Sequence, residues 1–132
     1  MAAHIYKGRS TNSNNILFTW DGKHLYNGNS TNSNNILYTY DGEYVFKGNS
    51  TNSNNVIFSF DGEYLYEGKS NNSSKILNTF DGDYILKGKS TNSNNIVFTL
   101  DNTYLYKGKS TNSNNILRTI SGNIPRIFLI IL

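Results

Sequence analysis

The sequence predicts an all-β protein made of six degenerate copies of one 20-residue hairpin unit. Three observations predict this fold: the chain aligns with itself every 20 residues, each unit holds two β-rich runs around a turn, and no window has a helical period. The glycine that closes each unit marks the period, at Gly8, Gly28, Gly48, Gly68, Gly88 and Gly108. We expect a β-hairpin repeat domain over residues 1–123 and an apolar C-terminal strand over 124–132.

Each unit reads as a β-hairpin, and residues 36–48 (ILYTYDGEYVFKG) are representative. Two runs of β-forming residues flank Asp41-Gly42, which suits a two-residue type I′ turn because both central residues need positive φ. The equivalent turns fall at Asp21-Gly22, Asp61-Gly62, Asp81-Gly82, Asp101-Asn102 and Ser121-Gly122.

A polar hexapeptide, STNSNN, joins each hairpin to the next. It occupies residues 10–15, 30–35, 50–55, 90–95 and 110–115, with the variant SNNSSK at 70–75. Serine, threonine and asparagine side chains bond their own backbone in turns, so this composition predicts a connecting loop. Its near-identity follows from the repetition of the hairpin, or from recent duplication without any function.

A parallel β-solenoid with one rung per repeat is the alternative arrangement. Stacked rungs would place Asp21, Asp41 and Asp61 about 4.8 Å apart. Such close like charges repel by about 1 kcal/mol each even in water. Successive hairpin turns lie about twice as far apart, so the charges favour an antiparallel array of hairpins.

A two-residue turn also predicts which side chains share a face, because cross-strand partners point the same way. It pairs Tyr40 with Glu43, Tyr38 with Val45 and Leu37 with Phe46. The expected core face, interrupted only by Asn78 and Arg118 in other units, carries Ile36, Tyr38, Tyr40 and Val45. The opposite face, Leu37, Thr39, Tyr44 and Phe46, is apolar enough to need a cover, which we expect from a second sheet, another subunit or a ligand.

The two ends of the repeat region are complementary halves of a hairpin. The chain opens with an outgoing strand at 4–8 (HIYKG), and the last incoming strand lies at 116–120 (ILRTI). Their pairing would close the array into a barrel, prism or propeller-like ring without exposed edges, whereas an unpaired arrangement would leave an open hairpin stack.

The chain finishes in an uninterrupted apolar run, IFLIIL, at 127–132. The run is too short to span a bilayer and has the composition of a β-strand that aggregates when exposed. We expect it either to plug the interior of its own ring or to pair with a neighbouring subunit. The candidate assembly residues are Ile127, Phe128, Leu129, Ile130, Ile131 and Leu132.

The consensus YKGxSTNSNNIL-TxDGxYLYKG, closing in a proline and an aliphatic tail, resembles short bacterial tandem-repeat proteins of unassigned function over nearly the whole chain. That resemblance implies no activity. More loosely, the tyrosine-rich hairpin with glycine at this period looks like the choline-binding and cell-wall-binding repeats, which are hairpin stacks with aromatic ligand sites between units. The tryptophan-rich motifs of those repeats are missing here, since Trp20 is the one tryptophan.

The sequence contains few residues in an arrangement that could support catalysis. The chain has no cysteine, and Gly-Lys-Ser at 68–70 lacks the upstream glycine and following helix of a phosphate loop. His4 and His24 occupy the position that Tyr44 holds in the second unit, which indicates a packing role. The acidic residues are dispersed at turns. We expect neither an enzyme nor a cofactor or metal.

The charge distribution and the absence of targeting segments limit the classes of partner that we expect. The net charge of +3 is spread along the chain without the clustered basic stripe of nucleic-acid binders, so we expect no nucleic acid. The sequence shows no signal peptide or membrane-spanning run, which makes a membrane partner unexpected and cytoplasmic residence the default. The expected partners are further copies of the chain.

The sequence thus predicts a structural or self-assembling repeat protein that interacts through strand edges and its apolar tail. The alternative is a multivalent glycan-binding module that uses tyrosine beside asparagine, serine and threonine. The candidate ligand-binding residues are Trp20, Tyr44, Phe46, Tyr64, Tyr66, Tyr84, Tyr104 and Tyr106.

Overall fold

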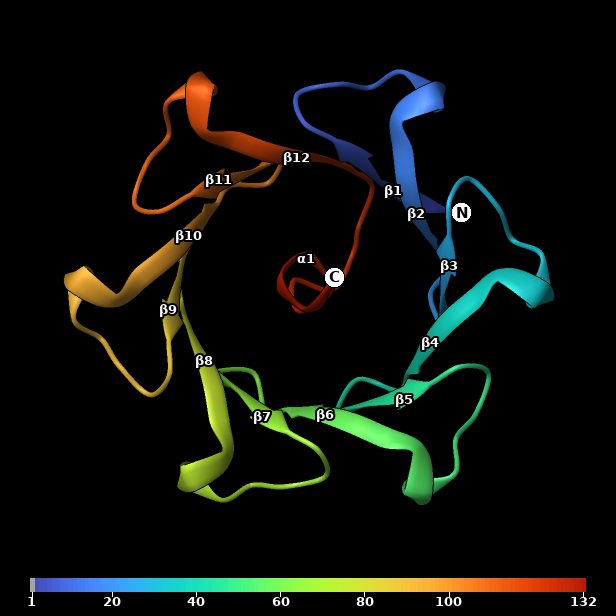
Figure 1. Ribbon diagram of the computed structural model, residues 1–132, viewed down its shortest axis with the longest axis horizontal. Coiled ribbons are helices and arrows are strands. Elements are labelled where there is room, and N and C mark those ends of the chain that lie inside the picture. The colour runs from blue at the N-terminus through green and yellow to red at the C-terminus, as the bar shows by residue number, and fades with distance from the viewer. Residues whose placement is uncertain (1) are drawn as a thin grey trace.

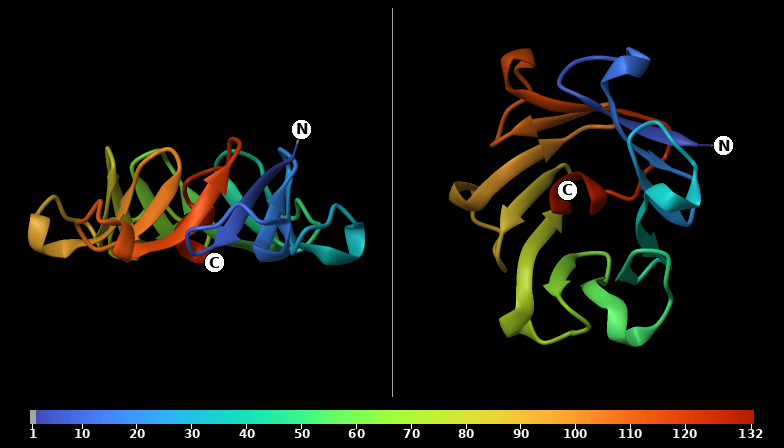
Figure 2. Two further views of the ribbon diagram at one scale, coloured as in Figure 1. Left: turned by 90° about the horizontal axis from the view of Figure 1, so that it is seen from above. Right: turned by 45° about the vertical axis from the view of Figure 1, so that its right-hand side comes forward.

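The computed structural model describes residues 2–132 as a flat ring of twelve antiparallel strands (Figures 1 and 2). The outgoing strands are β1 (Ala3–Lys7), β3 (His24–Asn27), β5 (Tyr44–Lys47), β7 (Tyr64–Glu67), β9 (Tyr84–Lys87) and β11 (Tyr104–Lys107). The incoming strands are β2 (Ile16–Trp20), β4 (Ile36–Tyr40), β6 (Val56–Phe60), β8 (Ile76–Asp81), β10 (Ile96–Leu100) and β12 (Ile116–Ser121).

The ring closes because β1 pairs with both β2 and β12. The seam between the chain ends sets Ile5 opposite Ile120 and Tyr6 opposite Thr119. Every strand therefore has two neighbours, all of them antiparallel. The closed ring of hairpins is confirmed, and the parallel solenoid is wrong. Closure also leaves no free sheet edge for the edge-to-edge interaction that the sequence suggested.

The register within each hairpin differs from the predicted one. Tyr40 lies opposite Val45 instead of Glu43, and Tyr38 lies opposite Lys47. Positive φ falls on Gly42, at 101°, and on no residue other than glycine in the described chain, so Asp41 does not enter a type I′ turn. Its carboxylate Oδ1 instead accepts the backbone N–H groups of Glu43 and Tyr44, at 3.0 and 2.7 Å. The shift is two residues, which preserves the faces of Tyr40 and Val45.

A β-bulge lies where each hairpin pairs with the preceding one. At the start of β4 it changes which side chains point into the ring and which point outward. Ile36 lies opposite Tyr26, whereas Tyr38 lies opposite Leu25, with a register shift between the two pairs. Ile36 is therefore on the outer face and was wrongly assigned to the core. The counterparts of Leu37 in later units, Ile57 and Val97, pack against the inner cluster.

The core fills the inside of the ring. Each outgoing strand contributes one aliphatic residue to this core, and each of these residues is at most 2% exposed: Ile5, Leu25, Val45, Leu65, Ile85 and Leu105. The incoming strands add larger side chains such as Trp20, Phe80 and Leu100. The predicted core face is confirmed for the Tyr38, Tyr40 and Val45 positions.

The C-terminal segment fills the centre as a short helix, α1 (Phe128–Ile131), as Figure 1 shows. The expectation of a strand is wrong, because a closed ring offers no edge to pair with, and the segment bonds its own backbone, with Leu129 N–H donating to the Arg126 carbonyl. Ile127 and Phe128 are fully buried, and the Phe128 ring lies 5.1 Å from that of Trp20. This is the plug arrangement. A role of Ile127–Leu132 in assembly stays a prediction.

The polar connectors, each holding a 3₁₀ turn, lie outside the ring like petals (Figure 1). The turns are η1 (Ser13–Asn15), η2 (Ser33–Asn35), η3 (Ser53–Asn55), η4 (Ser73–Lys75), η5 (Ser93–Asn95) and η6 (Ser113–Asn115). In the second unit, the hydroxyl of Ser50 accepts from Asn52 N–H and from the Asn55 side chain, at 3.0 and 2.8 Å. The Asn52 side chain caps the turn by accepting from Asn54 N–H at 2.9 Å. The repeated hexapeptide is thus a self-bonded loop.

The connectors also cover the outer face of the ring. Phe46, on that face, is only 4% exposed, and the neighbouring Thr39 bonds the backbone of the connector at Gly48 and Ser50. The cover expected from a second sheet, another subunit or a ligand is instead a loop of the same chain.

Candidate functional site

Among residues 2–132, no three histidine, cysteine or acidic side chains gather where they could hold a metal ion. The Asn49 side-chain oxygen Oδ1 accepts a hydrogen bond from His24 Nε2 at 3.1 Å, and the His24 ring packs edge-on to Tyr26 at 6.0 Å. His4 packs in the same way against Tyr6, at 6.1 Å. Both histidines therefore occupy the aromatic packing position that the repeat predicted.

A polar groove lies between neighbouring repeats on the rim of the ring. In its clearest copy, Glu43 and Tyr44 of one unit face Lys69, Ser70 and Asn71 of the next connector around a hollow of about 230 Å³. The Lys69 ammonium lies 5.5 Å from the centre of the Tyr44 ring, within cation–π range. Partial burial and the negative charge of Glu43 raise the pKa of the Tyr44 hydroxyl, which stays protonated and able to donate.

The same contact recurs in consecutive repeats. Lys89 lies 5.9 Å from the Tyr64 ring, and Lys109 lies 5.7 Å from the Tyr84 ring. An acidic residue precedes each of these tyrosines, whereas Thr103 precedes Tyr104. Three adjacent grooves therefore carry the full set of acid, tyrosine and lysine. We call them the Tyr44, Tyr64 and Tyr84 grooves.

The structure divides the candidate ligand-binding residues into three groups. Tyr44, Tyr64, Tyr84 and Tyr104 are half-buried at the rim. The next aromatic on each outgoing strand is covered by a connector: Phe46, Tyr66 and Tyr106 are at most 6% exposed. Trp20 lies inside the ring against Phe128. Only the rim tyrosines are thus brought to a shared, repeated surface.

Sequence reasoning missed the partners of these tyrosines, chiefly Lys69, Lys89 and Lys109. A signal was present in the repeat. Lysine follows the closing glycine in these three units, where Arg9, Asn29 and Asn49 stand in the others, and each lysine lies 25 residues after a tyrosine preceded by Glu or Asp. Only the ring geometry shows that residues 25 apart meet between repeats.

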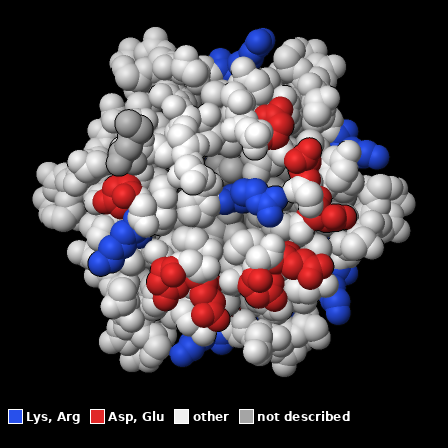
Figure 3. All heavy atoms as spheres, turned by 180° about the vertical axis from the view of Figure 1, so that it is seen from behind, with Lys and Arg blue, Asp and Glu red and all other residues white. Residues whose placement is uncertain are grey.

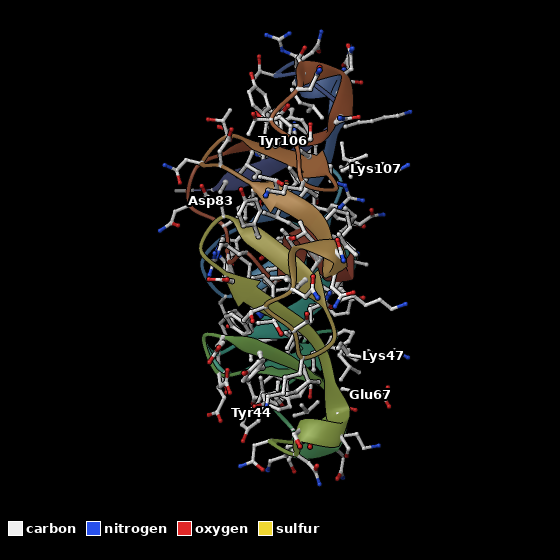
Figure 4. All side chains as sticks on the ribbon, turned by 90° about the vertical axis from the view of Figure 1, so that its left-hand side faces the viewer. Tyr44, Lys47, Glu67, Asp83, Tyr106 and Lys107 are labelled. Atoms are coloured by element: carbon white, nitrogen blue, oxygen red, sulfur yellow. The ribbon has the colours of Figure 1, made fainter. Side chains whose placement is uncertain are left out.

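The two flat faces of the ring carry opposite charge. The acidic face holds every acidic residue except Glu67, all of them in or beside the hairpin turns: Asp21, Asp41, Glu43, Asp61, Glu63, Asp81, Asp83 and Asp101. Figure 3 shows these acidic groups gathered around the middle of this face. The basic face holds Lys7, Lys47, Lys87 and Lys107, which end the outgoing strands at the other side. In Figure 4, Lys47 and Lys107 project from one side of the ring and Asp83 from the other.

A guanidinium enters the middle of the acidic face from the C-terminal segment. Arg126 donates through Nη1 to the Gly82 carbonyl at 2.8 Å, and its charge lies 5.3 Å from the centre of the Phe80 ring. It borders a cleft of about 440 Å³ together with Asp83, Asp101, Asn102 and Asn123. Arg126 therefore fastens the central plug to the turn of β8 and β9 and offsets part of the acidic charge.

No helix within residues 2–132 is long and apolar enough to cross a membrane. The sequence from residue 5 to residue 132 matches the family model described as 6-fold beta flower protein. Neither a curated protein nor a solved structure matches the sequence.

Proposed function

The chain belongs to the 6-fold beta flower family, and from that premise we propose that it is a non-enzymatic structural ring that assembles with copies of itself. The observation that carries this proposal is the separation of charge between the acidic face and the basic face. Opposite charges on opposite faces attract copies in one orientation, with the acidic face of one ring on the basic face of the next. Because such a head-to-tail contact uses two different surfaces, it does not close and builds a column of rings.

Other routes to assembly find less support in the geometry. The strand edges are all paired within the ring, and the apolar tail is packed inside it. The charged side chains on the two faces, such as Lys47 and Glu43, are exposed, and the hairpin turns project from one side of the ring (Figure 2). Both sets of charges are therefore accessible to a second ring.

Two charged residues within the repeats depart from the charge pattern and suggest a rotational register for the stack. Glu67 stands on the basic face where four of the other five units have lysine, and Lys23 stands on the acidic face at the position of Glu43 and Glu63. Rotating one ring by two repeats places Glu67 over Lys23. It also places Lys7, Lys87 and Lys107 over Asp83, Glu43 and Glu63, respectively. Of the six rotations, this one alone produces no like-charged pair between these two sets of positions.

Sedimentation velocity at several salt concentrations tests the proposal. We expect large species at low ionic strength that dissociate as it rises through about 0.1 M, where charges about 10 Å apart become screened. Glu67→Lys and Lys23→Glu should each weaken assembly, and the double variant should restore it. Lys75→Glu, on a connector, changes the net charge as Lys23→Glu does and is the matched control. A protein that is monomeric at every salt concentration would overturn the proposal.

The Tyr44, Tyr64 and Tyr84 grooves favour a second candidate function, multivalent glycan binding. Each combines a tyrosine ring that carries a lysine ammonium with the hydrogen-bonding groups of Ser70 and Asn71, or their counterparts, for sugar hydroxyls. Three adjacent weak sites on one rigid ring gain affinity through avidity.

A glycan array with the full chain tests this function. The triple variant Tyr44→Ala, Tyr64→Ala, Tyr84→Ala should lose the binding of any captured glycan, and one single variant should lose a small part of it. Tyr104→Ala is the control, because Thr103 replaces the acidic residue there. Binding that survives the triple variant would contradict the assignment to these grooves.

A further inference from the structure

An apolar pocket of about 520 Å³ opens beside α1 on the side of the ring where the outgoing strands end. Its walls are Leu17, Phe98, Leu105, Leu117, Leu129, Ile130 and Leu132. The volume lies in the range of small-molecule sites. Leu117 is the one large hydrophobic residue of the described chain that is well exposed, at 39%. The pocket therefore offers apolar surface that no part of the ring covers.

Two cations, and no acidic residue, border this pocket. Lys7 and Arg118 lie opposite each other across the seam between β1 and β12. Of the residues that the structure describes, no aspartate or glutamate lines the pocket, and the one acceptor of the Arg118 guanidinium is the main-chain oxygen of Leu132. A ligand that fits this chemistry combines a negative head with an apolar body.

Arg118 is an exception within the repeat. The five equivalent positions hold Phe18, Tyr38, Phe58, Asn78 and Phe98. Arg118 donates weakly through Nη2 to the Leu132 backbone oxygen at 3.4 Å, and its guanidinium lies 5.8 Å from the centre of the Phe18 ring. Its Nη1 is buried and has no hydrogen-bond partner. A half-buried guanidinium in an aromatic position is costly unless something pairs with it.

We infer that this pocket binds a fatty acid, with the carboxylate on Arg118 and Lys7 and the acyl chain along Leu117, Ile130 and Leu132. A carboxylate can accept two parallel hydrogen bonds from a guanidinium, which are among the strongest in proteins. The acyl chain replaces water on the apolar wall. This inference does not rest on the assembly of the rings or on the glycan grooves. Lys7 is the one residue that it shares with the proposed stacking contact.

The test is a titration of the full chain with decanoate labelled with ¹³C at the carboxyl carbon, followed by NMR below the micelle concentration. Rings are kept apart by moderate salt, which screens a half-buried pair less than it screens exposed charges. We expect saturable binding at one site for each ring. Decan-1-ol and decylammonium, which share the chain and lack the carboxylate, should bind at least about tenfold more weakly.

Arg118→Phe is the key variant, because phenylalanine already occupies this position in other repeats and should fold at least as stably. It should lower decanoate affinity by about tenfold or more, and Lys7→Gln by a smaller factor. Lys47→Gln, the same change on the same face away from the pocket, should have no effect. Equal binding of decanoate by Arg118→Phe, or of decan-1-ol by the unaltered chain, would overturn the inference. Binding to phosphatidylglycerol vesicles without binding of free decanoate would also overturn it and assign the cations to a lipid surface.

Discussion

The hydroxyl of Thr39 donates a 2.7 Å hydrogen bond to the carbonyl oxygen of Gly48 and so joins the ring to the connector that covers it. The same hydroxyl accepts from the Ser50 N–H at 3.3 Å. In each of the other repeats the equivalent hydroxyl also donates to the carbonyl oxygen of a closing glycine. These hydroxyls belong to Thr19, Ser59, Thr79, Thr99 and Thr119. The Thr119 bond reaches Gly8 and thereby links the two ends of the repeat region.

Thr39→Val should therefore destabilise the protein out of proportion to its small change in shape. Thr39 is 1% exposed, so the variant leaves the Gly48 carbonyl and the Ser50 N–H without their partner. We expect the free energy of unfolding in urea to fall by about 1–3 kcal/mol. Thr39→Ser, which copies Ser59, keeps the hydroxyl and should cost less. Equal losses in both variants would mean that packing, and not the hydrogen bonds, holds the connector.

Phe128→Ala should destabilise the ring by about 3–5 kcal/mol, because it empties the middle of the core. The Phe128 side chain is fully buried and lies 5.1 Å from Trp20 and 5.6 Å from Tyr40, centre to centre. Phe128→Leu keeps most of the volume and should cost much less. Urea unfolding followed by the fluorescence of Trp20 measures both. A folded and equally stable Phe128→Ala variant would show that the plug is dispensable.

Strong alkali should remove a contribution of Tyr66 to stability. The Tyr66 hydroxyl donates to Asp61 Oδ2 at 2.8 Å, and this hydrogen bond, with burial, raises the pKa of Tyr66 to about 12. Because the folded pKa lies above the ordinary value of about 10, the contribution is complete below pH 10. It is lost as the pH rises from about 10 to about 12. Urea unfolding measured across this range should show a shallower decline for Tyr66→Phe, and parallel curves would contradict the assignment.

Gly122→Ala should be more damaging than the same change in the turn of another repeat. An added Cβ at Gly122 would lie 2.7 Å from the Cβ of Ala3, across the seam that closes the ring. Gly62 has a similar positive φ, 100° against 90°, but an added Cβ there meets nothing within 4 Å. Thermal unfolding should show the larger loss for Gly122→Ala, and Ala3→Gly in the same chain should recover the steric part of it. Equal losses at the two glycines would contradict a tight seam.

Local pattern was enough to predict the hairpins and the faces of most strand positions, although not of the first residues of the incoming strands. The 20-residue period, the Asp-Gly turns and the alternation in ILYTY indicated six hairpins, and the half-units at 4–8 and 116–120 indicated closure. The predicted register failed by two residues because the Asp41 side chain bonds two backbone N–H groups, which moves the centre of the turn one residue along. The error did not exchange the faces of the strands, since side chains alternate with a period of two.

The repeat pattern predicted only one side of each rim groove, the tyrosine. Tyr44, Tyr64 and Tyr84 were candidates because they recur on the face that was expected to need a cover. Their partners Lys69, Lys89 and Lys109 come from the following connector and were not candidates. Phe46, Tyr66 and Tyr106 repeat equally well and are buried. Periodicity alone does not separate the two sets, because burial depends on where the connector folds back.

The repeat, the hairpin and the alternation of side chains are consequences of local chemistry, and the amino-acid order determines them directly. Closure of the ring decided the rest. It left no edge for the tail, which coils into the helix Phe128–Ile131 inside the core. It brought residues 25 apart together at the rim, and it sorted the turn carboxylates and the strand-end lysines onto opposite faces. These outcomes depend on contacts between distant residues, which a 20-residue pattern repeats but does not itself contain.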